Sequence, residues 1–153
     1  MVPCGVGAGE DSTLVIGADD GDHLRLAAGQ ASPGPDPADS WIPSVVEVTA
    51  GAFRARAESG VLASELARFR DDLAALPRDP RGRAALETED GWLAIRLFGD
   101  GFGHFDARCE LRDPDAVLHR LEFTIGLNAR DLPALLASVE AILAATSAAA
   151  PGA

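Results

Sequence analysis

The sequence has no lysine and no tyrosine, and its 153 residues include only two cysteines, Cys4 and Cys109. One cysteine is close to the N-terminus and the other is in a segment with a strand pattern, so we expect no structural disulfide, and this usage fits a reducing compartment. The first eleven residues lack the basic and apolar stretches of a signal peptide. Apolar runs of membrane-spanning length are also absent, so the sequence predicts a cytoplasmic protein without a membrane partner.

Positive charge is scarce, because thirteen arginines stand against 24 carboxylates and the formal net charge is −11. A surface of that sign repels nucleic acids and anionic membranes, and we therefore expect neither as a partner. A basic protein partner is compatible with the same charge. Solubility alone is the competing explanation, since many proteins are acidic for that reason.

Apolar and polar residues alternate with a period of two in much of the chain, which predicts strands with one covered and one solvent-facing side. Short turns rich in glycine, aspartate and proline separate these runs. The last three runs follow one another closely between Gly91 and Leu127 and predict an antiparallel meander. The predicted strands cover about 13–18, 23–27, 44–49, 52–59, 82–90, 93–98, 105–111 and 118–127.

Two segments have the apolar spacing of amphipathic helices. The first covers 63–76 and ends at Pro77, because the residue before a proline is driven out of the helical region. The second begins after Asn128, a good N-cap, with Asp131 three residues later and Pro133 in the first turn, where a missing N–H is harmless. Strands followed by a helix, twice over, predict an α+β fold. We expect an antiparallel sheet of about six to seven strands with two amphipathic helices on one face.

The length suits one domain with its own hydrophobic core, which we expect to span 12–146. Small residues dominate both ends of the chain, and we predict flexible termini at 1–11 and 147–153. The proline-rich segment 28–40 can sustain neither a strand ladder nor a helix, so it is predicted to be an exposed loop. No internal repeat is visible in the sequence.

No catalytic, metal or cofactor motif is recognisable. The glycine-rich stretches at 5–9 and 99–103 do not lie between a strand and a helix, as a phosphate loop must, and the aspartates at 19–22 are followed by residues that cannot ligate calcium. The three histidines lack zinc-ligand spacing. His104 near Asp106 is the single constellation of interest, and a solvated histidine explains it more simply than a general base. We therefore predict no catalytic residue, no metal and no cofactor.

Three segments of the chain resemble the WapI-like family of small bacterial immunity proteins. They are the helix LASELARFRDDLAAL, the strands GRAALETEDGWLAIRLFGDGFGHFDARCELRD, and the closing LEFTIGLNARDLPALLASVEAIL. The resemblance covers about Trp41 to Leu143 and includes Gly103-His104 and Asp131-Leu132. Asn128 to Arg130 and the insertion at 28–40 depart from the family pattern, which leaves the subfamily and its toxin undetermined.

The resemblance implies an immunity protein that neutralises a cognate polymorphic bacterial toxin, often a nuclease, by stoichiometric binding. Such a mechanism needs a complementary patch and no catalytic group, and carboxylates would complement a basic toxin surface. A small-ligand-binding or regulatory domain and an enzyme centred on His104 and Asp106 remain alternatives. The predicted partner-binding residues, which solubility would also explain, are Glu65, Asp71, Asp72, Glu87, Glu89, Asp90, Asp100 and Asp106.

Overall fold

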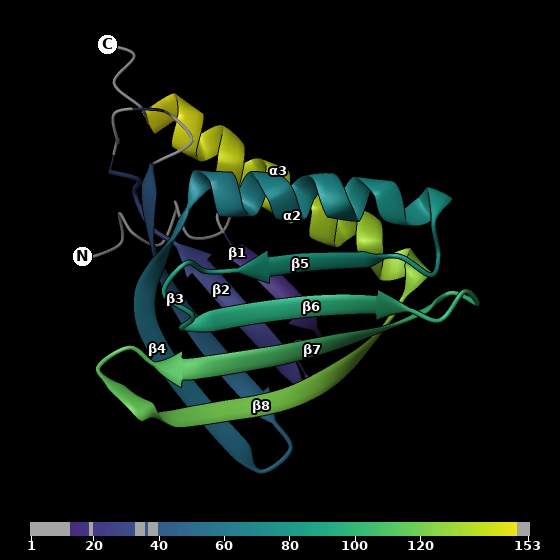
Figure 1. Ribbon diagram of the computed structural model, residues 1–153, viewed down its shortest axis with the longest axis horizontal. Helices are drawn as coiled ribbons and strands as arrows, with labels where there is room; N and C mark the ends of the chain where they lie inside the picture. The colour runs from purple at the N-terminus through teal and green to yellow at the C-terminus, as the bar shows by residue number, and fades with distance from the viewer. Residues whose placement is uncertain (1–12, 19, 33–35, 37–39, 150–153) are drawn as a thin grey trace.

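Two four-stranded antiparallel sheets and two α-helices make up the computed structural model, which describes residues 13–18, 20–32, 36 and 40–149 (Figure 1). The first sheet has the order β1 (Thr13–Gly17), β2 (His23–Ala28), β3 (Trp41–Ala50) and β4 (Phe53–Leu62). The second has the order β5 (Arg83–Glu87), β6 (Leu93–Gly99), β7 (His104–Asp113) and β8 (Ala116–Asn128). All neighbouring strands are sequential and antiparallel, so short turns connect most of them.

The helices follow the last strand of each sheet. Helix α2 (Ala63–Ala75) continues directly from β4 and ends in the 3₁₀ turn η2 (Leu76–Arg78), and α3 (Leu132–Ala149) follows β8 through the 3₁₀ turn η3 (Ala129–Asp131). The two predicted helices are therefore confirmed. They lie beside one another, with α2 along β5 and α3 along β1 (Figure 1).

The prediction of one sheet with six to seven strands is wrong, because eight strands form two separate sheets. The apolar sides of both sheets and of both helices contribute to one core cluster, in which Leu26 of β2 and Ile95 of β6 are fully buried. Alternation along a strand shows that one face is covered, but it does not reveal what covers it. Here each sheet covers the other, and the helices cover what remains.

The element order repeats although the sequence shows no repeat. Four antiparallel strands and a helix occur first over 13–75 and again over 83–149. The predicted flexible segment 1–11, the end of the predicted tail at 150–153 and most of the second half of the proline-rich segment lie outside the described residues. Helix α3 includes the backbone of 147–149.

Local sequence features explain two element boundaries. Strand β3 begins at Trp41 rather than at the predicted Ser44, because Pro43 lies opposite Gly60 and still accepts a hydrogen bond from the N–H of Gly29 at 2.7 Å. A proline cannot donate to a ladder, but its carbonyl can accept. At the other end of the chain, the carboxylate of Asp131 accepts the N–H of Asn128 at 2.8 Å, as the predicted capping interaction requires.

Candidate partner-binding surface

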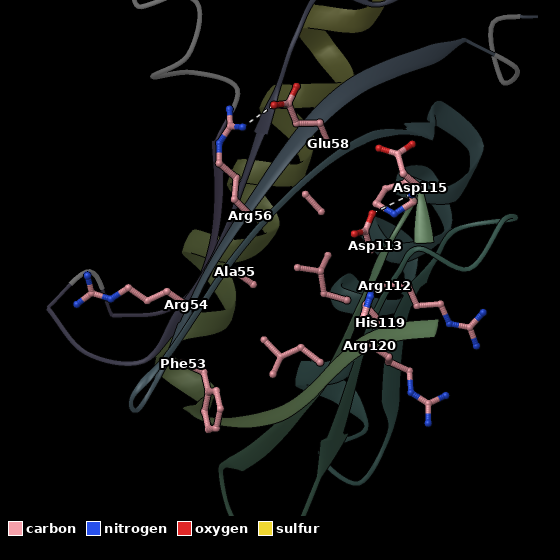
Figure 2. Close-up of a pocket in the computed structure, with 14 residues that line it drawn as sticks. Phe53, Arg54, Ala55, Arg56, Glu58, Arg112, Asp113, Asp115, His119 and Arg120 are labelled. Atoms are coloured by element: carbon pink, nitrogen blue, oxygen red, sulfur yellow. Dashed lines mark hydrogen bonds and ion pairs between the residues drawn. The ribbon is translucent and has the colours of Figure 1, made fainter. Parts of the chain in front are cut away.

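A groove of about 780 Å³ lies between β4 and the β7–β8 hairpin (Figure 2). Along its floor, Ala55 and Leu121 are partly uncovered beside the buried Ala57 and Leu111. Phe53, at the end of the groove, is 66% exposed. Such a surface can accept side chains of a partner protein.

Charged side chains surround this floor. The arginines Arg56, Arg112 and Arg120 pair with neighbouring glutamates on their own strands or hairpin, and Figure 2 shows the side chains of Arg112 and Arg120 directed away from the groove. Asp113 accepts the N–H of Asp115 at 2.9 Å, which shapes the turn. Among the described residues, neither aspartate has a cationic partner, so the Asp115 carboxylate and the second oxygen of Asp113 are available to a partner protein.

The β5–β6 turn brings two of the predicted residues next to this hairpin. The N–H of Arg112 donates to the carbonyl of Trp92 at 2.8 Å, so the turn that precedes Trp92 lies beside the β7–β8 hairpin. Glu89 and Asp90 are exposed in that turn. We call the four carboxylates of these two turns the acidic end: Glu89, Asp90, Asp113 and Asp115.

Two other predicted residues use their carboxylates inside the molecule. Glu65 accepts the N–H of Leu62 at 2.8 Å and the N–H of Glu89 at 2.7 Å, which ties the start of α2 to the β5–β6 turn. Asp72 accepts the N–H of Ala85 at 3.3 Å and so ties α2 to β5. Glu65 thus positions the β5–β6 turn, and both oxygens of Glu65 and one oxygen of Asp72 are already engaged.

Three further predicted residues lie elsewhere. Asp71 is exposed on α2 and pairs with Arg70 at 3.1 Å. Glu87 and Asp106 lie on the outer side of the second sheet, where Glu87 pairs with Arg96. Five arginines share that outer side, so its carboxylates do not form a purely acidic surface. They are Arg83, Arg96, Arg108, Arg112 and Arg120.

Asp100, the last of the eight, shapes the β6–β7 turn at the opposite end of the sheet. Its Oδ1 accepts the N–H of Phe102 at 2.7 Å and the N–H of His104 at 3.1 Å. These hydrogen bonds, the one from Phe102 first, lower the pKa of the Asp100 carboxyl. The eight predicted residues therefore do not form one patch but occupy the two ends of the second sheet, its outer side and α2.

The alternative constellation of His104 and Asp106 is not brought together as a pair. His104 is 71% exposed, and its Nδ1 lies 3.8 Å from Oδ2 of Asp100. Asp106 is exposed two residues further along β7. The histidine therefore lies beside the turn aspartate Asp100, and Asp106 is not its partner.

Cys109 is a free, buried cysteine in β7. Burial raises the pKa of the Cys109 thiol to about 12, so this cysteine is an inert core residue rather than a nucleophile. In the part of the chain that the structure describes, no group of three or more histidine, cysteine, aspartate or glutamate side chains could hold a metal ion. Among the same residues, no helix has the length and apolarity to cross a membrane.

Sequence reasoning missed four residues of these surfaces. It interpreted Asp113 and Asp115 only as turn formers, although two aspartates around a proline also place two carboxylates on an exposed tip. The alternation in 52–59 places Phe53 on the covered side of its strand, and the glycine-rich stretch 99–103 predicts only a turn around Phe102. An aromatic residue between glycines is the signal that could have revealed Phe102, since such a turn leaves a large side chain uncovered.

The comparisons with known proteins concern the whole fold. No curated protein matches this chain. A solved structure titled "Structure of the plant transcriptional regulator PBF-2" has 9% sequence identity and a TM-score of 0.48, and the match covers 89% of this chain and 81% of that chain. The immunity protein WapI-like family matches residues 15–147, which include both sheets and nearly all of α3. The resemblance found in the sequence is thereby confirmed, and the chain belongs to the WapI-like family of immunity proteins.

Proposed function

We propose that this protein neutralises a cognate bacterial toxin by binding it stoichiometrically, with the acidic end against a basic patch of the toxin. The observation that carries the proposal is the family match over residues 15–147, because an immunity role implies a toxin partner. The acidic end supplies four exposed carboxylates on two adjacent turns, next to a groove with an apolar floor. This combination of charged rim and apolar centre is typical of protein–protein interfaces.

A nuclease-type toxin fits the charge of this chain best. Proteins that bind nucleic acids carry basic surfaces, and a formal net charge of −11 attracts them from a distance. In this proposal Asp71, Glu87 and Asp106 contribute mainly to that long-range attraction, because they are spread over the molecule. Glu65 and Asp72 contribute by holding α2 in place.

Co-expression tests the proposal. The toxin domain encoded beside this protein is expressed in a bacterial host with and without it, and survival is scored. Complex formation is then measured by size-exclusion chromatography with light scattering, using the same toxin domain with its catalytic residue replaced. We expect survival and a complex of defined stoichiometry. Survival without a stable complex would contradict neutralisation by binding, and killing despite expression of this protein would contradict the immunity role toward that toxin.

A further inference from the structure

Phe102 is the most exposed of the large apolar side chains in the described part of the chain. It is 81% exposed at the tip of the β6–β7 turn, compared with 66% for Phe53 and 40% for Trp41. Trp41 packs against Gly60, and Phe53 borders the groove, so both have neighbours that explain them. Phe102 contributes almost no buried area, so packing within the described structure does not require an aromatic residue at this position.

The turn that carries Phe102 is held firmly from inside. Besides accepting the N–H of Phe102, Asp100 accepts the N–H of His104 with the same oxygen and donates its own N–H to the carbonyl of His104 at 3.0 Å. The glycines on both sides of Phe102 have positive φ, +87° at Gly101 and +95° at Gly103. A side chain other than glycine is strained there, so the sequence is adapted to this particular turn.

The same turn is also fixed from outside. The N–H of Gly101 donates to the carbonyl of Pro80 at 3.2 Å, and the N–H of Ala129 donates to the carbonyl of Gly103 at 2.8 Å. The first bond ties the turn to the segment before β5, and the second ties it to the end of β8. Phe102 is therefore presented on a backbone that loses little conformational freedom when a partner binds.

We propose that Phe102 is an anchor residue of the toxin complex, which inserts into an apolar pocket on the toxin, and that Asp100 is a positioning residue that holds the turn in its binding geometry. This inference rests on the proposed function and deepens it. Aromatic side chains on preorganised turns are favoured anchors, because they bury a large area without a large loss of entropy. Asp100, predicted as a charged contact, acts here through the backbone of the turn.

The acidic end and Phe102 have separate kinetic roles. They lie at opposite ends of the second sheet (Figure 1), since the β5–β6 and β7–β8 turns share one end and the β6–β7 turn occupies the other. Charges act through solvent over roughly 8 Å at physiological salt and mainly set the association rate. Phe102 acts only in direct contact, so it sets the dissociation rate.

The experiment measures association and dissociation rates of the full chain with the catalytically inactive toxin domain, together with the thermal midpoint of each variant. We expect Phe102→Ala to keep the thermal midpoint and the association rate and to raise the dissociation rate about 30-fold. Trp41→Ala is the control, a partly exposed aromatic outside both the groove and the β6–β7 turn, and should change the dissociation rate far less. Asp100→Ala should raise the dissociation rate, and Asp100→Asn, which keeps the accepting oxygen, should restore it.

Each other outcome overturns a stated part of the inference. Unchanged dissociation of Phe102→Ala, or a large effect of Trp41→Ala in its place, would show that Phe102 is not the anchor. An equal rise of the dissociation rate in Asp100→Ala and Asp100→Asn would show that Asp100 acts by its charge rather than by positioning the turn. If the unaltered protein forms no complex at all, the proposed function fails and the anchor fails with it. If the unaltered protein forms a complex and Phe102→Ala leaves the dissociation rate of that complex unchanged, only the anchor role of Phe102 is rejected.

Discussion

The indole N–H of Trp92 donates a hydrogen bond of 2.9 Å to the carbonyl oxygen of Gly60. Trp92 is 2% exposed and stands just before β6, whereas Gly60 lies near the end of β4, so this bond connects the two four-strand units. Gly60 also packs under the ring of Trp41. A Cβ atom at position 60 would lie only 2.4 Å from atoms of that ring. The junction of the two sheets therefore depends on a buried polar contact as well as on apolar packing.

Replacement of Trp92 by phenylalanine should destabilise the fold by about 1–3 kcal/mol, because it leaves the buried carbonyl of Gly60 without its donor. The free energy of unfolding in urea measures the effect. Trp41→Phe is the control, since Trp41 is partly exposed and the hydrogen bond to this carbonyl comes from Trp92. Equal losses in the two variants would show that ring size, and not the hydrogen bond, is what matters.

Glu65→Ala should lower the free energy of unfolding by about 1–2 kcal/mol, because two backbone N–H groups, of Leu62 and Glu89, lose their acceptor. Glu65→Gln keeps one accepting oxygen and should recover about half of the loss. Asp71→Ala, on the exposed side of the same helix, should stay within about 0.5 kcal/mol of the unaltered protein. A loss in Asp71→Ala as large as in Glu65→Ala would contradict the assigned role.

Cys109 should be unreactive toward thiol reagents at pH 8 in the native protein and reactive in denaturant. A pKa raised from 9.0 to about 12 leaves about a thousandth of the thiolate that the unfolded chain has. A Cys4→Ser variant isolates this signal in a titration with a chromogenic disulfide reagent. Rapid labelling of the folded variant would contradict the burial of Cys109.

The same thiol makes stability depend on pH in the alkaline range. Its pKa is higher in the folded than in the unfolded protein, so its contribution is complete below about pH 9 and is lost as the pH rises toward 12. The difference in unfolding free energy between the unaltered protein and Cys109→Ala should therefore narrow above pH 9. A constant difference between pH 8 and pH 11 would refute this linkage.

Removal of charge at the acidic end should slow association with the toxin. The double variant Glu89→Gln/Asp90→Asn removes two carboxylates and changes the formal net charge from −11 to −9. We expect its association rate at low salt to fall about threefold or more, with a weaker salt dependence and little change in dissociation. The control Asp20→Asn/Glu140→Gln makes the same change of charge on the β1–β2 turn and on α3. Equal slowing by both variants would show that net charge, and not its position, controls association.

Local periodicity predicted the elements well. The spacing of Leu62, Leu66, Phe69 and Leu73 placed the first helix at 63–76, and the structure has it at Ala63–Ala75. The runs with period two correspond to the eight strands. These patterns succeed because side-chain direction along a helix or strand depends on the backbone geometry alone.

The arrangement of the acidic residues was not predictable in the same way. Glu65 and Asp71 are six residues apart on one helix, yet one accepts two backbone N–H groups and the other faces solvent. Asp113 joins Glu89 at the acidic end because Arg112 bonds across to Trp92. Such relationships depend on which strands pair and which elements pack together, and no local pattern encodes them.

The sequence by itself determined the strands, the helices, the excess of carboxylates and the resemblance to immunity proteins, because each of these depends on neighbouring residues or on composition. The tertiary structure decided that the eight strands divide into two sheets, and that Asp100 braces the turn that exposes Phe102. Both are outcomes of contacts between segments far apart in the chain. The apolar side of a strand must be covered, but only the packed molecule shows whether a helix or a second sheet covers it.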